Sequence, residues 1–508
     1  MKKDNVLNKT IHGVKWNYIS VIVTSIFQLI HTAILSRLLD PAAFGLLAMA
    51  NTVLRFGAYF SRMGIGSALI QKPDVSEEDI RAGFTLSVGL GAIVSLIIVL
   101  IAPLAKFLFD SQEVIPVIRV YALTMFINGF SIVSVSLLRR RFRFRELFIS
   151  ELVSYLIGSI IVGISLAFLD FGVWSLIFAS IVQVIVLAII AIIFSRHSIK
   201  PIFFKETFNP LVSFGSRVSL ISFIEYLNYN LDTILIGRFL GESLLGIYNR
   251  AYHIISLPTE KITTSLTRVL FSSFSEIQIN VKNIRQGYLI SLEIIGLLIF
   301  PFAFSISGAA KEVVLIILGD KWIETIPVLR ILSLAVAFIL LSNINGILFE
   351  AMGWLNEKIK LVVFRLIFIS VTIFLAARFG LVGILSGIFI VSIIFYFIYM
   401  SFIYRKMDYY FRDFSAIHFS ILISGIIAIS STYLISYFGS LLNLSLLIIL
   451  ILQIIMGGLI VLFFTYIHPS KSIVVFFIKY IVNSETAYNF PGIKMVKKHY
   501  KNLADNKL

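Results

Sequence analysis

Long apolar runs divide the chain, and short stretches rich in Gly, Pro and charged residues separate them. A helix that crosses a bilayer needs roughly 20 predominantly apolar residues, and the chain offers about fourteen such runs. We expect them near 13–36, 44–63, 83–108, 115–138, 147–168, 174–195, 212–236, 244–272, 286–308, 325–349, 357–377, 380–403, 413–437 and 444–466. The pattern therefore predicts an all-α, polytopic membrane protein.

Composition supports this class and excludes several chemistries. Hydrophobic residues make up 58% of the chain, charged residues only 14%, and the mean hydropathy is +0.97. That is far more apolar surface than a water-soluble core buries. The chain has no cysteine, which rules out disulfides, thiolate metal sites and a cysteine nucleophile. The first residues, Met1 to Val6, do not resemble a cleavable signal peptide, so we expect the first helix to be retained.

Two hairpins of the chain repeat each other. The segment Gly13-Val-Lys15-Trp-Asn-Tyr-Ile-Ser20 returns as Gly215-Ser-Arg217-Val-Ser-Leu-Ile-Ser222. The segment Arg37-Leu-Leu-x4-Phe44-Gly45-Leu46 returns as Arg238-Phe-Leu-x4-Leu245-Gly246-Ile247. Residue 215 follows residue 13 by 202, and residue 246 follows residue 45 by 201. This tandem repeat of a membrane module is typical of transporters, in which two similar half-bundles move about a site between them.

Charge predicts the orientation of the helices. With the N-terminus in the cytoplasm, most Lys and Arg residues fall in inner segments, which places both termini inside. The same residues account for the net charge of +16 through contact with anionic headgroups, without nucleic acid. We read the run from Arg139 to Arg145 as topogenic or lipid-facing charge, and expect the connections 64–82 and 139–146 to be solvated loops. Beyond His468, a basic amphipathic tail is predicted.

Polar residues recur at helical spacing in the first, second, seventh and eighth apolar runs. Since charge within a bilayer is costly, such faces usually line a cavity or meet a partner. These helices open the two repeats, so their polar faces predict the lining of a central vestibule. The stripes are Asn17, Ser20, Thr24, Gln28 and His31; Asn51, Arg55, Tyr59 and Arg62; Ser222, Glu225, Asn228 and Asp232; and Asn249, His253, Ser256, Glu260, Thr263 and Thr267, with Arg250 beside the last.

A few of these residues are candidates for the site. Arg55 lies near the middle of its predicted span, which favours a place in the cavity, whereas Arg250 lies nearer an end and is open to snorkelling. Glu225 and Asp232 are either ligands of a coupling ion or ion-pair partners of these arginines. Three neutral polar residues of the stripes complete the predicted substrate site: Gln28, Asn51 and Asn249. Lys15, Arg37 and Arg217 are expected at helix ends.

Two motifs resemble those of a known family. The first is Ala33-Ile-Leu-Ser-Arg37-Leu-Leu-Asp40-Pro41-x-x-Phe44-Gly45, and the second is Asn230-Leu-Asp232-x-x-Leu235-Ile-Gly237-Arg238-x-Leu240-Gly241-x3-Leu245-Gly246-x-Tyr248. Both are similar to signatures of Wzx-type polysaccharide flippases, in the polysaccharide-transport branch of the multidrug/oligosaccharidyl-lipid/polysaccharide (MOP) exporter superfamily. The likeness spans about residues 10 to 408 and is greatest to the colanic-acid and teichuronic-acid exporters.

The resemblance implies an architecture and a cargo. Two six-helix lobes, 1–205 and 206–408, would be related by a pseudo-two-fold axis, with two further helices in 409–467 and the tail in 468–508. The implied cargo is a polyprenyl-diphosphate-linked oligosaccharide, such as an undecaprenyl-linked repeat unit, flipped across the cytoplasmic membrane by alternating access for surface polysaccharide biosynthesis. A diphosphate suits arginine, whose planar fork binds two oxygens, so Arg55 and Arg250 are the expected phosphate ligands. Membrane lipids, a polysaccharide polymerase and glycosyltransferases are the other implied partners.

The sequence also bears on the energy source of transport and on alternative functions. The chain lacks a Gly-x4-Gly-Lys-Ser/Thr stretch, so we expect no ATP hydrolysis, no enzymatic activity and no cofactor or metal, but coupling to H+ or Na+ through Asp232 or Glu225. A drug or metabolite antiporter of the MATE type and a peptidoglycan-precursor flippase remain as alternatives on the same fold. A membrane polysaccharide polymerase is a further alternative, although the predicted outer loops are short for a catalytic domain.

Overall fold

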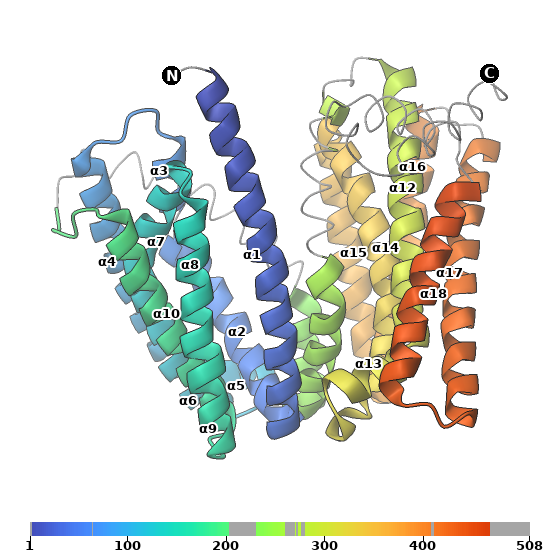
Figure 1. Cartoon of the computed structure of the whole chain (residues 1–508), viewed down its shortest axis with the longest axis horizontal. Coiled ribbons are helices and arrows are strands. Elements are labelled where there is room, and N and C mark those ends of the chain that lie inside the picture. The colour runs from blue at the N-terminus through green and yellow to red at the C-terminus, as the bar shows by residue number, and fades with distance from the viewer. Residues whose placement is uncertain are drawn as a thin grey trace. The chain divides into compact units, whose positions relative to one another are not determined.

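The computed structural model describes residues 3–62, 64–202, 230–259, 270, 273–275, 280–407 and 411–467. These residues are almost entirely helical, and no strand occurs within the described ranges. They fall into two compact units (Figure 1). The first unit comprises Met1–Arg250 with Ile317–Trp322, and the second comprises Ala251–Ile316 with Ile323–Leu508.

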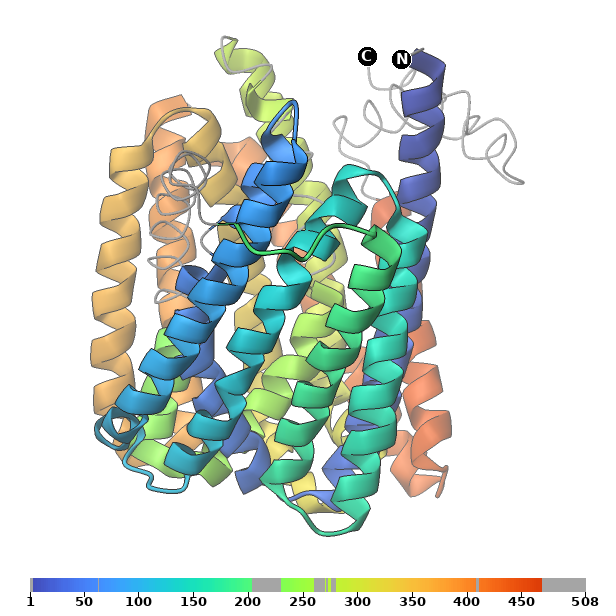
Figure 2. The same ribbon diagram turned by 90° about the vertical axis from the view of Figure 1, so that its left-hand side faces the viewer.

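The first unit is a helical bundle with short connections (Figure 2). A helical stretch at 230–259 is broken at Gly241, where φ is +78°. The π-helix Leu156–Gly163 continues α8 directly into α9. The remaining helices are α1 (Lys3–Leu38), α2 (Pro41–Arg62), α3 (Ile65–Gln71), α4 (Glu77–Ile101), α5 (Ala105–Phe109), α6 (Val114–Tyr121), α7 (Leu123–Arg140), α8 (Phe144–Tyr155), α9 (Ile164–Phe168) and α10 (Val173–Ser195).

The second unit is also a bundle of long helices. Its last two helices, α17 and α18, lie side by side and both pack on α12. The helices are α12 (Val281–Gly308), α13 (Ala310–Ile317), α14 (Thr325–Ala351), α15 (Leu355–Ala376), α16 (Gly380–Met407), α17 (Phe411–Leu441) and α18 (Leu446–Ile467).

Ten of the fourteen predicted membrane-spanning runs coincide with described helices that are long and apolar enough to cross a bilayer; 13–36, 44–63, 212–236 and 244–272 are not among these. Within the described residues, nine helical segments are long and apolar enough to cross a bilayer, and one of them, Leu355–Met407, joins two predicted spans. The all-α, multi-span class is therefore confirmed. Most of the predicted run at 212–236 and the tail at 468–508 lie outside the described residues. The division into lobes at residue 205 stays a prediction.

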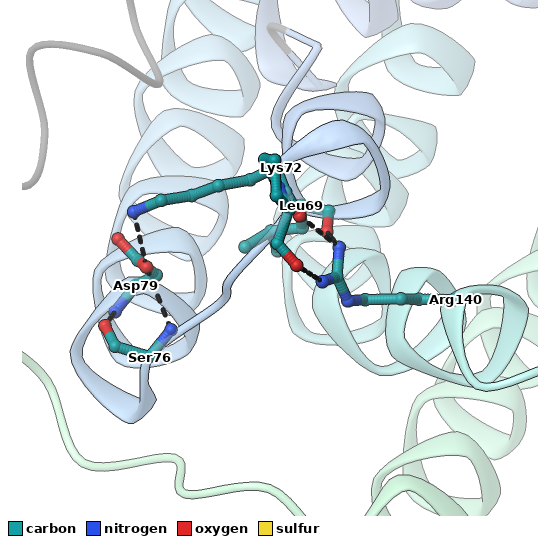
Figure 3. Close-up of polar contacts among 6 residues, drawn as sticks. Leu69, Lys72, Ser76, Asp79 and Arg140 are labelled. Carbon is teal, nitrogen blue, oxygen red and sulfur yellow. Dashed lines mark hydrogen bonds and ion pairs between the residues drawn. The ribbon is translucent and has the colours of Figure 1, made fainter. Parts of the chain in front are cut away.

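The predicted loop at 64–82 is wrong in part. Helix α3 occupies residues 65–71. Ser76 caps the start of α4 in a capping box: the Ser76 hydroxyl accepts a hydrogen bond from the Asp79 backbone N–H, and the Asp79 carboxylate accepts one from the Ser76 backbone N–H. Asp79 is only 5% exposed and forms an ion pair with Lys72 at 2.6 Å (Figure 3). Asp74, Glu77 and Glu78 are exposed, as expected. Asp79 is instead buried at the start of α4, because a capping residue followed three positions later by an acid satisfies otherwise unpaired backbone donors.

The basic run at 139–145 binds the ends of helices. Arg140 donates to four backbone carbonyls at and just beyond the end of α3, those of Leu69, Ile70, Lys72 and Pro73, at 2.6–3.0 Å. Figure 3 labels Arg140 with two of these partners, Leu69 and Lys72. Arg141 and Arg143 donate to the carbonyls of Ser195 and Phe194 at the end of α10, each at 2.7 Å. The last turn of a helix leaves carbonyls without partners. The expectation of a merely solvated loop is therefore wrong for these three arginines.

The two repeated hairpins contact each other at their repeat-related glycine positions, Gly45 and Gly246. A Cβ atom added to Gly45 of α2 would overlap the Glu242 carbonyl oxygen, and one added to Gly246 would overlap the Pro41 carbonyl oxygen. Glu242 follows Pro41 by the same 201 residues that separate the glycines, so the contact is reciprocal. Only glycine permits backbones to approach this closely. The repeated glycines therefore allow the two helices to pack closely where they cross.

We predict that Arg140→Ala destabilises the protein by about 1–3 kcal/mol, because it leaves carbonyls at the α3 end without donors. Arg140→Lys should recover only part of this, since one ammonium group cannot reproduce the guanidinium fork. Thermal unfolding of the purified protein measures the effect. The neighbouring Arg139, whose exposed side chain makes no hydrogen bond to described residues, provides the control: an equal loss in Arg139→Ala would contradict this role.

We also predict that Gly45→Ala and Gly246→Ala each lower the unfolding temperature, by an overpacking cost of about 1–3 kcal/mol. The cost arises because the new methyl group meets backbone that cannot rotate away. Gly89→Ala in α4 is the matched control, because nothing lies within 4 Å of its Cβ position. That change should be neutral or stabilising. Similar behaviour of all three variants would show that the crossing tolerates a methyl group.

Candidate functional site

Arg250 stacks on an aromatic ring in the first unit. Its guanidinium carbon lies 4.3 Å from the centroid of the Phe44 ring, and one terminal nitrogen donates to Asn249 Oδ1 at 3.1 Å. The Nε atom is buried without a hydrogen-bond partner. No carboxylate of the described part of the chain lies within 4 Å of its nitrogens. A desolvated cation–π contact contributes about 2 kcal/mol, but it does not neutralise the charge.

Phe44 is itself fixed by the turn that follows α13. The Trp322 ring packs edge-on against Phe44 with centroids 5.5 Å apart, and Trp322 is fully buried. Its indole Nε1 donates to the carbonyl of Ser36 on α1 at 2.7 Å. Arg37, on the next position of α1, donates to the Ile317 carbonyl at 3.3 Å. The ring under Arg250 is therefore held by both α1 and the 317–322 segment.

A histidine and a tyrosine also lie near Arg250. The Tyr155 hydroxyl and His31 Nδ1 form a hydrogen bond of 3.0 Å, and both groups are within electrostatic range of Arg250. Tyr155 is the last residue of α8, directly before the π-helix. Single π-turns often occur at functional sites. We call Arg250, Asn249, Phe44, His31 and Tyr155 the arginine cluster.

Arg55 occupies a second position on the same face of α2. It follows Phe44 by eleven residues, which corresponds to about 16 Å along the helix axis. Asn51 lies one turn before it and accepts a hydrogen bond of 3.1 Å from the Tyr121 hydroxyl, which is within electrostatic range of Arg55. Arg55 is exposed in the described structure. The two arginines thus mark separate positions along α2 rather than one clamp.

Asp232 bonds within its own hairpin. Its carboxylate accepts a short hydrogen bond from the Tyr248 hydroxyl and another from the Thr233 backbone N–H at 2.7 Å. Both Asp232 and Tyr248 belong to the second family motif, so this contact explains why the motif carries them together. No ion pair between Asp232 and Arg250 occurs among the described side chains. Its role as an ion ligand stays a prediction.

The remaining candidates divide as follows. Gln28 is half-buried on α1, one turn before His31 and on the same face. Glu225 lies outside the described residues. Within the described ranges, no group of three or more His, Cys, Asp or Glu residues is placed to hold a metal ion. The structure thus brings together Arg250 and Asn249 in one place and Arg55 and Asn51 in another.

Sequence reasoning missed the aromatic parts of the site. Phe44, Tyr121, Tyr155 and Trp322 are apolar enough to read as core, and each is recognised only by the polar group that it contacts. One signal was present in the sequence: Ile115-Pro-Val-Ile-Arg119 returns as Ile326-Pro-Val-Leu-Arg330. Each copy of this second repeat follows a segment that contacts an arginine of the family motifs. Arg238 forms an ion pair with Asp110 at 3.6 Å, and Arg37 donates to the Ile317 carbonyl.

Comparison with known proteins gives the family. The family model described as "Polysaccharide biosynthesis protein" matches residues 34–327, which is more than half of the chain. The lipopolysaccharide biosynthesis protein WzxC of Escherichia coli K12 is 27% identical over 393 residues, which cover 76% of this chain and 79% of WzxC. The teichuronic acid biosynthesis protein TuaB of Bacillus subtilis 168 is 25% identical over 354 residues, 69% of this chain and 72% of TuaB. The chain belongs to this polysaccharide biosynthesis family.

Solved structures show the same fold. The lipid II flippase MurJ in an inward closed conformation superposes with a TM-score of 0.66 at 15% identity, covering 89% of this chain and 98% of MurJ. An inward-facing multidrug resistance MATE transporter of the MOP superfamily gives a TM-score of 0.58 at 16% identity, with coverage of 76% and 94%. The expected MOP-type fold and multi-pass membrane character are therefore confirmed, and the family is one of polysaccharide biosynthesis, as the resemblance implies.

We predict that Asp232 and Tyr248 stabilise the protein as a pair. Tyr248→Phe and Asp232→Asn should each cost about 1.5–3 kcal/mol, the range for a hydrogen bond to a charged group. The double variant should cost little more than either single variant, because both changes break the same bond. Thermal unfolding of the four proteins provides the cycle. Additive losses would instead assign Asp232 a role that is independent of Tyr248.

Proposed function

We propose that this protein flips a polyprenyl-diphosphate-linked oligosaccharide across the cytoplasmic membrane by alternating access, as a step of surface polysaccharide biosynthesis. The single observation that carries the proposal is Arg250, a half-buried guanidinium on the Phe44 ring for which no described carboxylate serves as counter-ion. A charge inside a membrane protein is expensive unless a partner compensates it. An anionic headgroup supplies that partner when the cargo is bound.

Arginine suits this headgroup for a geometric reason. Its planar fork donates two parallel hydrogen bonds to phosphate oxygens, whereas lysine offers a point charge. Stacking on Phe44 fixes the plane of the fork, and the bond to Asn249 fixes its rotation. Arg55 then offers a second anion position further along α2, so the diphosphate would pass between Arg55 and Arg250 during transport.

Neutral polar groups near the arginines match the sugars. Asn51 and Tyr121 lie beside Arg55, while Asn249 and the His31–Tyr155 pair lie beside Arg250. Amides, hydroxyls and an imidazole both donate and accept hydrogen bonds, as sugar hydroxyls require. Gln28 would extend this lining along α1. The polyprenyl chain would remain among the lipids.

Orientation and partners follow from charge and family. We place the protein in the cytoplasmic membrane with both termini inside, on the basis of the Lys and Arg distribution. Relatives named for lipopolysaccharide, teichuronic acid and succinoglycan biosynthesis support a saccharide cargo. Glycosyltransferases would supply the lipid-linked repeat unit, and a polymerase would consume it. No bond of the cargo is made or broken, so the protein acts as a transporter and not as an enzyme.

The alternatives fit the arginine cluster less well or share its chemistry. A MATE-type antiporter for cationic drugs would gain nothing from an uncompensated guanidinium. A peptidoglycan-precursor flippase would bind the same diphosphate, and the family match favours a surface polysaccharide instead. The coupling ion, H+ or Na+, would bind a carboxylate, and Asp232 and Glu225 are the candidates within the proposed vestibule.

We predict that Arg250→Ala slows headgroup flipping by about 10-fold or more, the kinetic equivalent of losing a charge-assisted hydrogen bond. Arg250→Lys should retain part of the rate. Phe44→Leu should also retain part of the rate, because the Arg250 guanidinium loses the ring on which it stacks. The measurement is the transfer of a lipid-linked oligosaccharide across proteoliposomes that contain the purified protein. Arg55→Ala should also slow flipping.

The matched control is Arg378, which stacks over Phe379 at 4.8 Å in the second unit but belongs to neither arginine position. Arg378→Ala should flip at the normal rate. Each variant is first checked for normal yield and thermal unfolding, so that a loss of rate reports on transport. A normal rate in both Arg250→Ala and Arg55→Ala would remove the arginines from the site and with them the basis of this proposal.

A further inference from the structure

A carboxylate is buried in the second unit, where α13 meets α17 and α18. Glu312 of α13 is 1% exposed. Its Oε1 atom accepts a hydrogen bond from Ser436 Oγ of α17 at 2.5 Å, and its Oε2 atom accepts one from Gln453 Nε2 of α18 at 3.3 Å. Both donors are neutral. The carboxylate therefore has two neutral hydrogen-bond partners and the favourable N-terminus of the short helix α13, but neither partner brings a compensating positive charge.

No cation compensates Glu312 among the described residues. None of the Lys, Arg or His side chains in those ranges lies within 4 Å of its oxygens. The adjacent Lys311 is exposed, and adjacent residues of a helix point in different directions. Buried charges in proteins are generally paired with an opposite charge or bound to a metal ion. The charge of Glu312 thus calls for a cation that is not part of the described chain.

Two oxygens at or near Gln453, one of the partners of Glu312, lack partners themselves. Gln453 is 1% exposed; its Nε2 atom also donates to the Thr432 carbonyl at 2.9 Å, but its Oε1 atom accepts nothing. The two atoms share one carboxamide, so Oε1 lies in the same cluster. Ser305 Oγ of α12 is likewise buried without a partner, 2.9 Å from the Cβ position of Gly457. Gly457 lies one turn after Gln453 on α18.

The donor set selects the ligand. Carboxylate, carboxamide and hydroxyl oxygens are the ligands of hard cations. A single carboxylate balances one positive charge, whereas calcium and magnesium sites generally combine several charged or water ligands. A proton on Glu312 would neutralise the charge but would leave the Gln453 and Ser305 oxygens unsatisfied. The arrangement therefore favours a monovalent metal cation.

We propose that Glu312, with Gln453 Oε1 and with Ser436 and Ser305 as supporting hydroxyls, forms a buried Na+ site in the second unit. The site is separate from Asp232 and Glu225, the carboxylates of the proposed vestibule. Binding of Na+ stands independently of the cargo. Only its use as a coupling ion rests on the proposed flippase function.

The test is the thermal unfolding of the purified full-length protein in detergent, with NaCl replaced stepwise by N-methyl-D-glucamine chloride at constant ionic strength. Na+ should raise the unfolding temperature of the natural protein in a saturable manner, because a ligand that binds only the folded state stabilises it. Glu312→Gln should abolish this increment. In N-methyl-D-glucamine it should unfold at or above the temperature of the natural protein, since it keeps the shape and removes the uncompensated charge.

Two further variants keep the proposal testable if Glu312→Gln fails to fold. Ser436→Ala and Ser305→Ala should raise the half-saturating Na+ concentration by roughly 10-fold, as outer-shell changes do in metal sites. Direct binding of radioactive sodium to the same proteins is the second measurement. Arg250→Ala should bind sodium normally, so failure of the flipping assay and failure of this site are distinguishable.

Three results would overturn the proposal. One is a natural protein that binds no radioactive sodium and shows no Na+-specific rise in unfolding temperature. Another is a stability that depends on pH alone, which would assign a proton to Glu312. The third is loss of the Na+ effect in Asp232→Asn but not in Glu312→Gln, which would move the cation to the vestibule carboxylate.

Discussion

The cost of leaving a polar or charged group unsatisfied in an apolar bundle governs most of this structure. It explains why Arg140, Arg141 and Arg143 cover carbonyls at helix ends. It also explains why Asp232 holds Tyr248 and why Asn51 holds Tyr121. Because almost every such group has a partner, the exceptions carry information. Among the described residues, Arg250 and Glu312 have only neutral hydrogen-bond partners; they differ in sign and belong to different units. The same constraint therefore underlies both proposals, an anionic headgroup at Arg250 and Na+ at Glu312.

The repeated hairpins share a scaffold but not a chemistry. Gly45 and Gly246 occupy equivalent positions of the repeat, and each lies close to backbone of the other hairpin. Gly45 approaches Glu242, and Gly246 approaches Pro41, which is the repeat equivalent of Glu242. The proposed substrate positions do not follow this symmetry. Displaced by the same 201 residues, Arg250 corresponds to Met49, Arg55 to Ser256, and His31 to Asp232. Duplication thus preserved the small residue that the crossing requires, while the polar faces diverged. An asymmetric cargo with a charged end and a neutral saccharide needs such divergence, because a symmetric pair of cationic surfaces would bind both ends alike.

Sequence reasoning reached the class and most of the spans, because apolar length and helical spacing are properties of single segments. The roles of Arg55 and Arg250 stay predictions. Sequence reasoning missed features that depend on contacts between segments. The acidic cluster at 74–79 and the basic run at 139–145 looked like solvated loops, since nothing in their composition shows that Asp79 is buried or that Arg140 reaches the end of α3. Phe44 and Trp322 looked like ordinary core residues, because a cation–π platform has the composition of a core. Glu312 was passed over for the opposite reason: it lies in a short segment between two spans, and only the fold places it against α17 and α18.

The two uncompensated charges have a common consequence for transport. Without ligands, the protein carries a half-buried positive charge at Arg250 and a buried negative charge at Glu312, and neither has a described counter-ion. Binding of an anionic headgroup would neutralise the first, and binding of Na+ would neutralise the second. Moving a desolvated charge between two conformations costs more than moving a neutral pair, so the fully loaded protein would meet the lowest electrostatic barrier. Under this scheme the cation contributes to transport without contacting the cargo. Coupling would then depend on both charges being neutralised together, and not on a direct exchange of ligands at one site.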